Sequence, residues 1–102
     1  MSGVQRGYGY QYETVAAGQS LQMLGASGAA GDYLHRLIVT VSTAATSGVT
    51  LTDGVVNIAI VPALVASGVG VIDIELNMAS LTSGWKVTTG AGVTVVAVGL
   101  FS

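Results

Sequence analysis

Side chains capable of acid–base or metal chemistry are few and scattered in this sequence. The chain has 102 residues, with one histidine, five acidic residues and no cysteine. A metal site needs several ligands at close spacing, and no carboxylate lies at such a spacing from His35. His35 alternates with Leu37, Val39 and Val41, so we interpret it as a hydrogen-bonded packing residue. The sequence predicts no catalytic residue, no metal site, no cofactor and no enzyme activity.

Three evenly spaced glycines, Gly25, Gly28 and Gly31, match a phosphate-binding loop only in part. A dinucleotide fingerprint requires a helix after the glycines, and a P-loop requires a lysine after the last one. Asp32 follows Gly31 instead, and no helical pattern comes after it. We therefore expect a structural loop.

Two further features allow a functional and a structural interpretation. Asp73 and Glu75 share one face of a predicted strand, which suits either a calcium or glycosidase pair or a solvated sheet face. Trp85 is either a sugar-stacking platform or a core residue that shares a face with Val87. We favour the structural interpretation of both, because solvated sheet faces are common and a small core needs large residues.

The composition points to contacts with other proteins. Only 8% of the residues are charged and 51% are apolar, whereas about a quarter of an average chain is charged. Either partner subunits cover much of the surface, or serine, threonine, glycine and asparagine supply its polarity. We favour the first alternative. The net charge of −2 and the dispersed Arg6, Arg36 and Lys86 argue against a nucleic-acid partner.

The longest uncharged stretch, residues 54–72, is long enough to span a bilayer. It contains Pro62 and several glycines, and no basic cluster flanks it. We therefore expect no membrane helix. The N-terminal residues lack the apolar segment of a secretory signal.

Alternating apolar and polar residues, interrupted by turn signals every 8 to 12 residues, indicate about eight short strands. This pattern predicts an all-β fold, a two-layer antiparallel β-sandwich. Asp53-Gly54 stands between two β-branched segments and predicts a tight type I′ hairpin turn. The expected core residues are Leu37, Val39, Ile72, Ile74, Val87 and Val95.

Residues 1–9 are predicted to form a flexible N-terminal arm, and residues 10–102 a single sandwich domain. The arm region carries Arg6 and the alternating tyrosines Tyr8, Tyr10 and Tyr12. Tyrosine is enriched at protein interfaces, so these four residues are the expected partner contacts. Two other outcomes remain open, a disordered tail or a first strand of the chain's own sheet.

The last predicted strand, residues 93–101, is apolar on both faces. One face of such a strand belongs to the core, so the other must meet something else. A second copy of the chain is the simplest candidate, and we expect a homo-oligomer, a trimer first and a dimer second. The expected interface residues are Leu34, Ile38, Val96, Val98 and Leu100.

The stretch GAAGDYLHRLIVTVSTAATSGVTLTDG, followed by SGWKVTTGAGVTVVAVG, resembles small virion proteins encoded by tailed bacteriophages and prophages. The shared features are a Gly-Asp-Tyr-Leu segment, a Thr-Leu-x-Asp-Gly turn and a Trp-Lys-Val-Thr-Thr-Gly segment near the C-terminus. The resemblance covers about residues 15 to 100. It implies a jelly-roll-like fold and a capsid decoration protein, assembled as an oligomer on an icosahedral head.

Two functions are therefore expected. The first is a virion structural protein that is made in the host cytoplasm, binds the major capsid protein and stabilises the outside of the capsid. The alternative is a carbohydrate- or receptor-binding β-sandwich of a phage tail or fibre.

Overall fold

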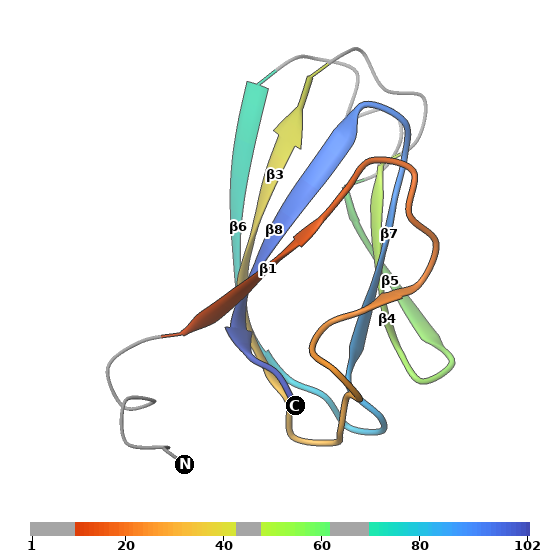
Figure 1. Ribbon diagram of the computed structural model, residues 1–102, viewed down its shortest axis with the longest axis vertical. Helices are drawn as coiled ribbons and strands as arrows, with labels where there is room; N and C mark the ends of the chain where they lie inside the picture. Colours follow the sequence, from red (N-terminus) through yellow and green to blue (C-terminus); the bar gives the residue numbers. More distant parts are fainter. Residues whose placement is uncertain (1–9, 43–47, 62–69) are drawn as a thin grey trace.

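The computed structural model describes residues 10–42, 48–61 and 70–102, so the predicted contacts Arg6 and Tyr8 lie outside the described residues. These described residues form eight strands and no helix, which confirms the predicted all-β fold (Figure 1). The strands are β1 (Gln11–Val15), β2 (Gln22–Met23), β3 (Tyr33–Val41), β4 (Val49–Asp53), β5 (Val56–Val61), β6 (Gly70–Ala79), β7 (Trp85–Thr89) and β8 (Val93–Leu100).

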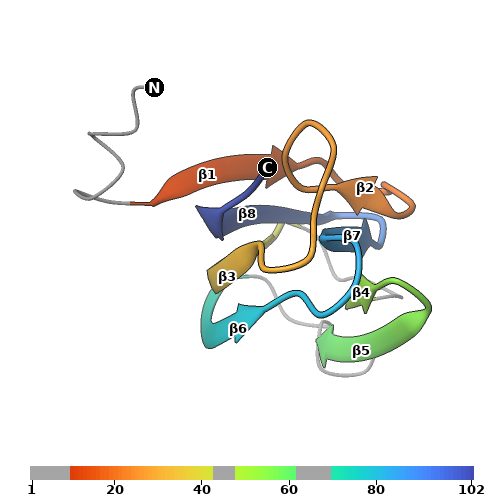
Figure 2. The same cartoon turned by 90° about the horizontal axis from the view of Figure 1, so that it is seen from below.

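The strands form two antiparallel sheets of four strands each, with orders β1-β8-β3-β6 and β2-β7-β4-β5. The sheets lie face to face, as predicted (Figure 2). Only β4 and β5 are consecutive neighbours in one sheet, and every other connection passes from one sheet to the other. This is the strand order of an eight-stranded jelly roll, in which both sheets keep free edges.

The core lies between the sheets and consists almost entirely of aliphatic side chains. Four of the predicted core residues, Leu37, Val39, Val87 and Val95, are fully buried there. The other two, Ile72 and Ile74, face the core but are only half-buried. Both belong to β6, an edge strand of the described sheet, so none of the eight described strands shields them on one side.

A β-bulge in β3 overturns two predictions about which face its residues occupy. Relative to β8, the register shifts between Leu34 and Arg36 by one inserted residue, which reverses the alternation of β3 at that point. Leu34 is consequently fully buried in the chain's own core, so its prediction as an interface residue is wrong. The alternation predicts that His35 packs with Leu37, but His35 lies on the opposite, outward side with Arg36.

The predicted hairpin is present between β4 and β5, but its turn differs in type. Asp53 pairs with Val56, so the two central residues are Gly54 and Val55. Gly54 has φ of 64°, and Val55 is not among the residues with positive φ. A positive φ at the first central position alone is the type II′ pattern, for which glycine is the preferred residue.

Candidate functional site

The side of the first sheet turned away from the core is the strongest candidate surface, and we call it the outer face. Residues paired across neighbouring strands project on the same side of a sheet. One row across the outer face is therefore Thr14, Val96, Ile38 and Asp73. The next row is Tyr12, Val98, Arg36 and Glu75.

The middle of the outer face is apolar and its margins are aromatic or charged. Val96, Val98 and Ile38 occupy the two central strands and are half-buried only by their neighbours. At the margins, Tyr12 is 73% exposed and Leu100 is 38% exposed. This arrangement resembles an interface, with an apolar centre and a more polar rim.

The outer face unites residues that the sequence placed in two separate groups. The predicted interface residues Ile38, Val96, Val98 and Leu100 lie on it, whereas Leu34 does not. Of the arm tyrosines, Tyr12 lies on the same face, because β1 pairs with β8 of its own sheet. Gln11–Val15 forms β1 of the chain's own sheet, whereas the predicted arm, residues 1–9, lies outside the described residues.

An aromatic cluster stands at the lower margin of the outer face, next to the β3 bulge. The ring of Tyr10 stacks on His35, with centroids 4.5 Å apart, and lies 5.8 Å from the ring of Tyr33. The Tyr33 hydroxyl donates a hydrogen bond of 2.7 Å to Asn77 Oδ1. Partial desolvation is the main cause of the raised pKa of Tyr33, and the nearby side chains of Tyr10 and Glu75 raise it further. The Tyr33 phenol therefore stays protonated and can donate this hydrogen bond.

The hydrogen bonds assign a role to each nitrogen of His35. Nδ1 lies 2.8 Å from Asn77 Oδ1, an acceptor, so this nitrogen carries the proton. Nε2 then faces Arg36 Nη2 at 3.4 Å, and Arg36 Nη1 donates to Asp73 at 2.7 Å. The cluster thus holds donors, acceptors and aromatic surface in one fixed arrangement, which suits recognition of a polar or aromatic partner group.

The sequence analysis missed Tyr33 and Asn77 as members of this cluster. Alternation with Leu37 places Tyr33 on the core face, but the bulge interrupts that alternation. Asn77 has φ of 53°, a left-handed conformation that asparagine tolerates better than most residues. The available signal in the sequence was an asparagine directly after the alternating residues 71–76. Such a residue does not indicate which side chains it will contact.

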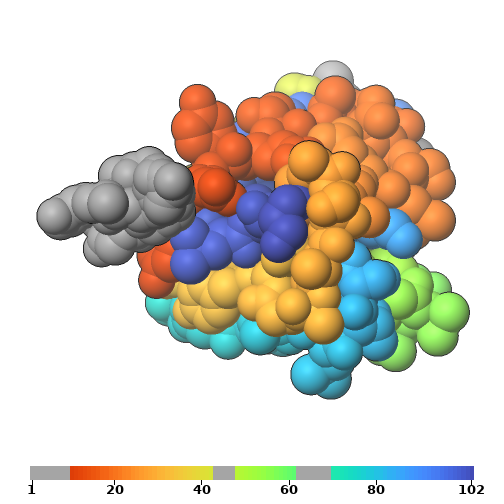
Figure 3. All heavy atoms as spheres, turned by 60° about the horizontal axis from the view of Figure 1, so that its bottom comes forward, coloured from red at the N-terminus to blue at the C-terminus, as the bar shows by residue number. Residues whose placement is uncertain are grey.

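The other candidates from the sequence serve the fold. Gly25 N–H donates to Glu13, and the N–H groups of Ser27 and Gly28 donate to the backbone oxygen of Ser102. Figure 3 shows this loop, in orange, against the blue C-terminal residues. Asp32 accepts hydrogen bonds from the backbone and hydroxyl of Ser102, so the loop is structural.

Trp85 and Asp73 are both engaged in contacts within the chain's own fold. Trp85 is 2% exposed, and its indole N–H donates to the backbone oxygen of Asp32 at 3.0 Å. Asp73 is engaged with Arg36, at the one ion pair among the described residues. Across residues 10–42, 48–61 and 70–102, no three acidic or histidine side chains gather as metal ligands.

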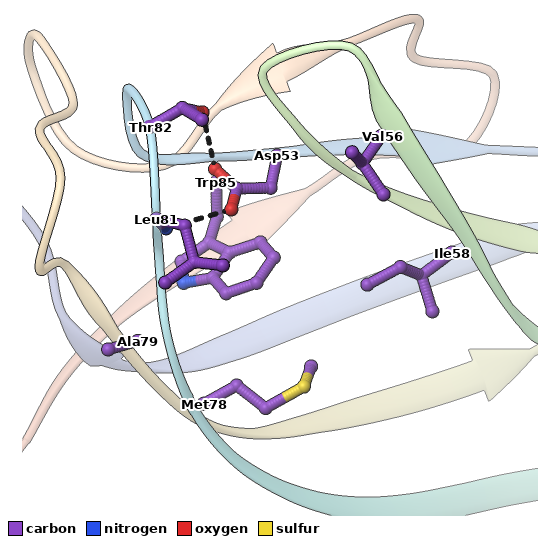
Figure 4. A pocket seen from close by; sticks show the side chains of 8 residues that line it. All are labelled: Asp53, Val56, Ile58, Met78, Ala79, Leu81, Thr82 and Trp85. Carbon is purple, nitrogen blue, oxygen red and sulfur yellow. Dashed lines mark hydrogen bonds between the residues drawn. The ribbon is translucent and has the colours of Figure 1, made fainter.

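An apolar pocket of about 430 Å³ lies at the lower end of the sandwich, between the edge strands β5 and β6 (Figure 4). Its lining residues are Asp53, Val56, Ile58, Met78, Ala79, Leu81, Thr82 and Trp85. The Asp53 carboxylate accepts hydrogen bonds from the hydroxyls of Ser80 and Thr82 and from Leu81 N–H. The carboxylate oxygens of Asp53 are therefore engaged in hydrogen bonds within the chain, and the pocket offers mainly apolar surface to a ligand.

Comparison with known protein families, curated proteins and solved structures finds no match for this chain. In the part of the chain that the structure describes, no helix is long and apolar enough to cross a membrane.

Proposed function

We propose that the chain is a virion structural protein that binds the outside of a phage capsid and stabilises it. The observation that carries this proposal is the outer face, a sheet surface with an apolar centre formed by Ile38, Val96 and Val98. Water contact with such a surface is costly, so it favours association with another protein surface. The resemblance to phage virion proteins supports the choice of a capsid as the assembly.

Within this proposal, copies of the chain associate through the apolar centre of the outer face, as a trimer first and a dimer second. Tyr10 and Tyr12 lie at the rim of that face, next to the start of the described chain. In this proposal they contact the major capsid protein together with Arg6 and Tyr8, which precede them in the sequence. In this arrangement the tyrosine rim contacts the boundary between capsid subunits, while the apolar centre of the outer face holds the copies together.

The first test is the oligomeric state of purified protein by analytical ultracentrifugation. We expect an oligomer at micromolar concentration and its dissociation or precipitation by Val98→Asp, because a buried unpaired charge is expensive. Thr94→Asp is the matched control, since it adds the same charge to the same strand and face at a polar position paired with Thr40, one row beyond Val96. A soluble wild-type monomer at micromolar concentration would contradict the association.

The second test is co-sedimentation with capsids assembled from the major capsid protein of the same genome. Wild-type protein should bind and raise the temperature at which these capsids disrupt. Deletion of residues 1–9, or Tyr12→Ala, should weaken capsid binding while the circular dichroism spectrum stays that of a β protein. If both variants bind with full affinity, the tyrosine rim is not the attachment site.

The aromatic cluster favours a second candidate function, carbohydrate or receptor binding on a phage tail or fibre. Tyr10 and Tyr33 present aromatic rings beside the polar groups of Asn77 and Arg36, a combination that also suits sugars. A glycan array distinguishes the two functions. Binding to a defined glycan that Tyr10→Ala abolishes would favour this candidate over capsid decoration.

A further inference from the structure

The two edge strands β5 and β6 leave the sandwich open along one side. Each has a single partner strand in the described part of the chain, β4 for β5 and β3 for β6. Their core-facing side chains form a half-buried aliphatic row, which we call the seam. The seam consists of Ile58, Ile60, Ile72, Ile74, Leu76 and Met78.

The pocket beneath Trp85 is the lower end of this seam. Ile58 and Met78 belong to both, and Figure 4 shows the Trp85 ring between the two strands. Two apolar residues that line the pocket are strongly exposed, Leu81 at 85% and Val56 at 56%. The volume of about 430 Å³ lies within the roughly 300–1,000 Å³ range of ligand sites. This end of the seam has room for a large apolar group.

The free edge of β6 adds a second kind of recognition to the seam. The strand has 10 residues and contains no proline, and its charged residues are both acidic, Asp73 and Glu75, which disfavour pairing with an acidic strand but not with a basic one. Unpaired N–H and C=O groups on such an edge can bind an extended chain. An added strand would place alternate side chains over the seam, opposite Ile72, Ile74 and Leu76.

The charges on β6 define the other side of that added strand. Asp73 and Glu75 project on the outer face, two residues apart. Asp73 is paired with Arg36, whereas no ion pair involves Glu75 among the described residues. An added strand would therefore gain most from a lysine or arginine opposite Glu75, because opposite charges stabilise a cross-strand pair.

We propose that the free edge of β6 binds an extended segment of another protein in which basic residues alternate with apolar ones. The basic side chains lie over Asp73 and Glu75, and the apolar side chains cover the seam, with one large residue in the pocket beneath Trp85. Two sources within this chain fit less well. Antiparallel pairing of two β6 strands around residues 73–75 would bring carboxylates of the two copies side by side. In the N-terminal arm, Arg6 would project on the same side of an extended chain as Val4 and Tyr8, so basic and apolar side chains would not alternate.

A seven-residue peptide tests this binding directly. It carries lysine or arginine at its four odd positions and valine, phenylalanine and valine at its three even positions, with blocked ends. Trp85 is the chain's single tryptophan, so its fluorescence reports occupation of the pocket. We expect saturable binding that changes Trp85 emission. A peptide of the same composition without the alternation, and an acidic version with glutamate at the odd positions, should bind at least tenfold more weakly.

Backbone methylation tests the strand pairing itself. The N–H groups of odd and even residues point to opposite edges of an extended peptide. N-methylation of one set should therefore weaken binding at least tenfold, while methylation of the other set leaves it nearly unchanged. Equal affinity of both methylated peptides would overturn edge pairing.

Variants of the protein test the charge and the pocket separately. Glu75→Gln should weaken peptide binding about three- to fivefold, the scale of one exposed ion pair. Thr14→Lys is the matched control, because it changes the net charge equally on β1, at the opposite edge of the same sheet. Leu81→Ser should weaken binding about threefold without unfolding, because Leu81 is exposed. Unchanged affinity in both Glu75→Gln and Leu81→Ser would contradict the site.

Two other occupants give distinct outcomes. If the chain self-associates through β6, sedimentation will show an oligomer that Glu75→Lys strengthens and the peptide fails to disperse, which overturns the proposal. If an aliphatic fatty acid changes Trp85 emission and no peptide does, the pocket binds a small apolar ligand instead, which also overturns it. The apolar centre of the outer face and the β6 edge meet only at the margin formed by Asp73 and Glu75. Val98→Asp tests the apolar centre and Leu81→Ser tests the pocket, so the capsid tests above and these peptide tests can fail independently.

Discussion

The two long sides of the sandwich are closed in different ways. On one side, β1 and β2 are consecutive edge strands of opposite sheets, and the segment between them joins the sheets by hydrogen bonds. The Thr89 hydroxyl donates to Ala16 O at 2.6 Å and accepts from Gln19 N–H at 2.9 Å. The Glu13 carboxylate accepts from Gln22 and from Gly25 N–H. We call this side the closed edge.

On the other side, β5 and β6 face each other across the seam, and we call this side the open edge. In the described residues, no strand pairing joins β5 to β6. The lower end of this side has a polar clamp, where Asp53 of β4 holds the loop after β6 through Ser80, Leu81 and Thr82. The closed edge is thus joined by polar contacts between its two edge strands, whereas the open edge, in the described residues, is held at its lower end and keeps surface available for a partner.

The largest expected effect comes from the Asp53 clamp. Asp53→Ala should lower the free energy of unfolding by about 3 kcal/mol, because it leaves one N–H and two hydroxyls without their charged acceptor. Urea denaturation followed by Trp85 fluorescence measures this loss. The control is Asp73→Ala, which removes an exposed ion pair and should cost less than about 1 kcal/mol. Equal losses would mean that the clamp does not stabilise the open edge.

The same clamp predicts a pH dependence. Burial alone would raise the pKa of Asp53, but hydrogen bonds from Leu81 N–H and the Ser80 and Thr82 hydroxyls outweigh it and hold the pKa below its ordinary value of 3.8. A lowered pKa in the folded state stabilises the protein above pH 3.8, and this contribution disappears as the pH falls through the folded-state pKa. In urea titrations at a series of acidic pH values, Asp53→Asn should therefore lose less stability than wild type. Parallel losses in the two proteins would assign the acid sensitivity to other carboxyls.

A smaller effect is expected at the closed edge. Thr89→Val keeps the shape of the side chain but leaves Ala16 O and Gln19 N–H without their partner, which should cost about 2 kcal/mol. Thr94→Val, on the outer face, should be nearly neutral in the same denaturation experiment. If Thr89→Val is also neutral, water replaces the hydroxyl and the closed edge is less tightly joined than its geometry indicates.

The smallest effect compares one apolar residue from each edge of the first sheet. Val15 of β1 is fully buried, whereas Ile74 of β6 is half-buried on the seam. Val15→Ala should cost about 2 kcal/mol and Ile74→Ala about 1 kcal/mol, although the second change removes more carbon atoms. Measured in the presence of the alternating peptide, the order should reverse, because the peptide would bury Ile74. An Ile74→Ala loss larger than that of Val15→Ala without peptide would show that the open edge is already covered.

The alternation of apolar and polar residues was enough to predict much of this architecture. Val93 to Leu100 and Val71 to Leu76 follow a period of two, and both segments are strands with the expected core faces. A local pattern suffices there, because neighbouring side chains of a strand must point to opposite sides. The double-sided apolar character of β8 likewise predicts Val96 and Val98 as outward residues, and the strand pairing places both on the outer face.

Tertiary structure alone decided where that pattern breaks and which surfaces meet. The bulge before Arg36 sends Leu34 inward and His35 outward, and it depends on pairing with both β6 and β8, which are distant in the sequence. The same long-range pairing brings Tyr12 beside Val98 and leaves β5 and β6 as neighbouring free edges. The sequence thus determined which side of most strands is apolar. Strand order, which depends on contacts between remote segments, determined which apolar sides became core and which remained available for binding.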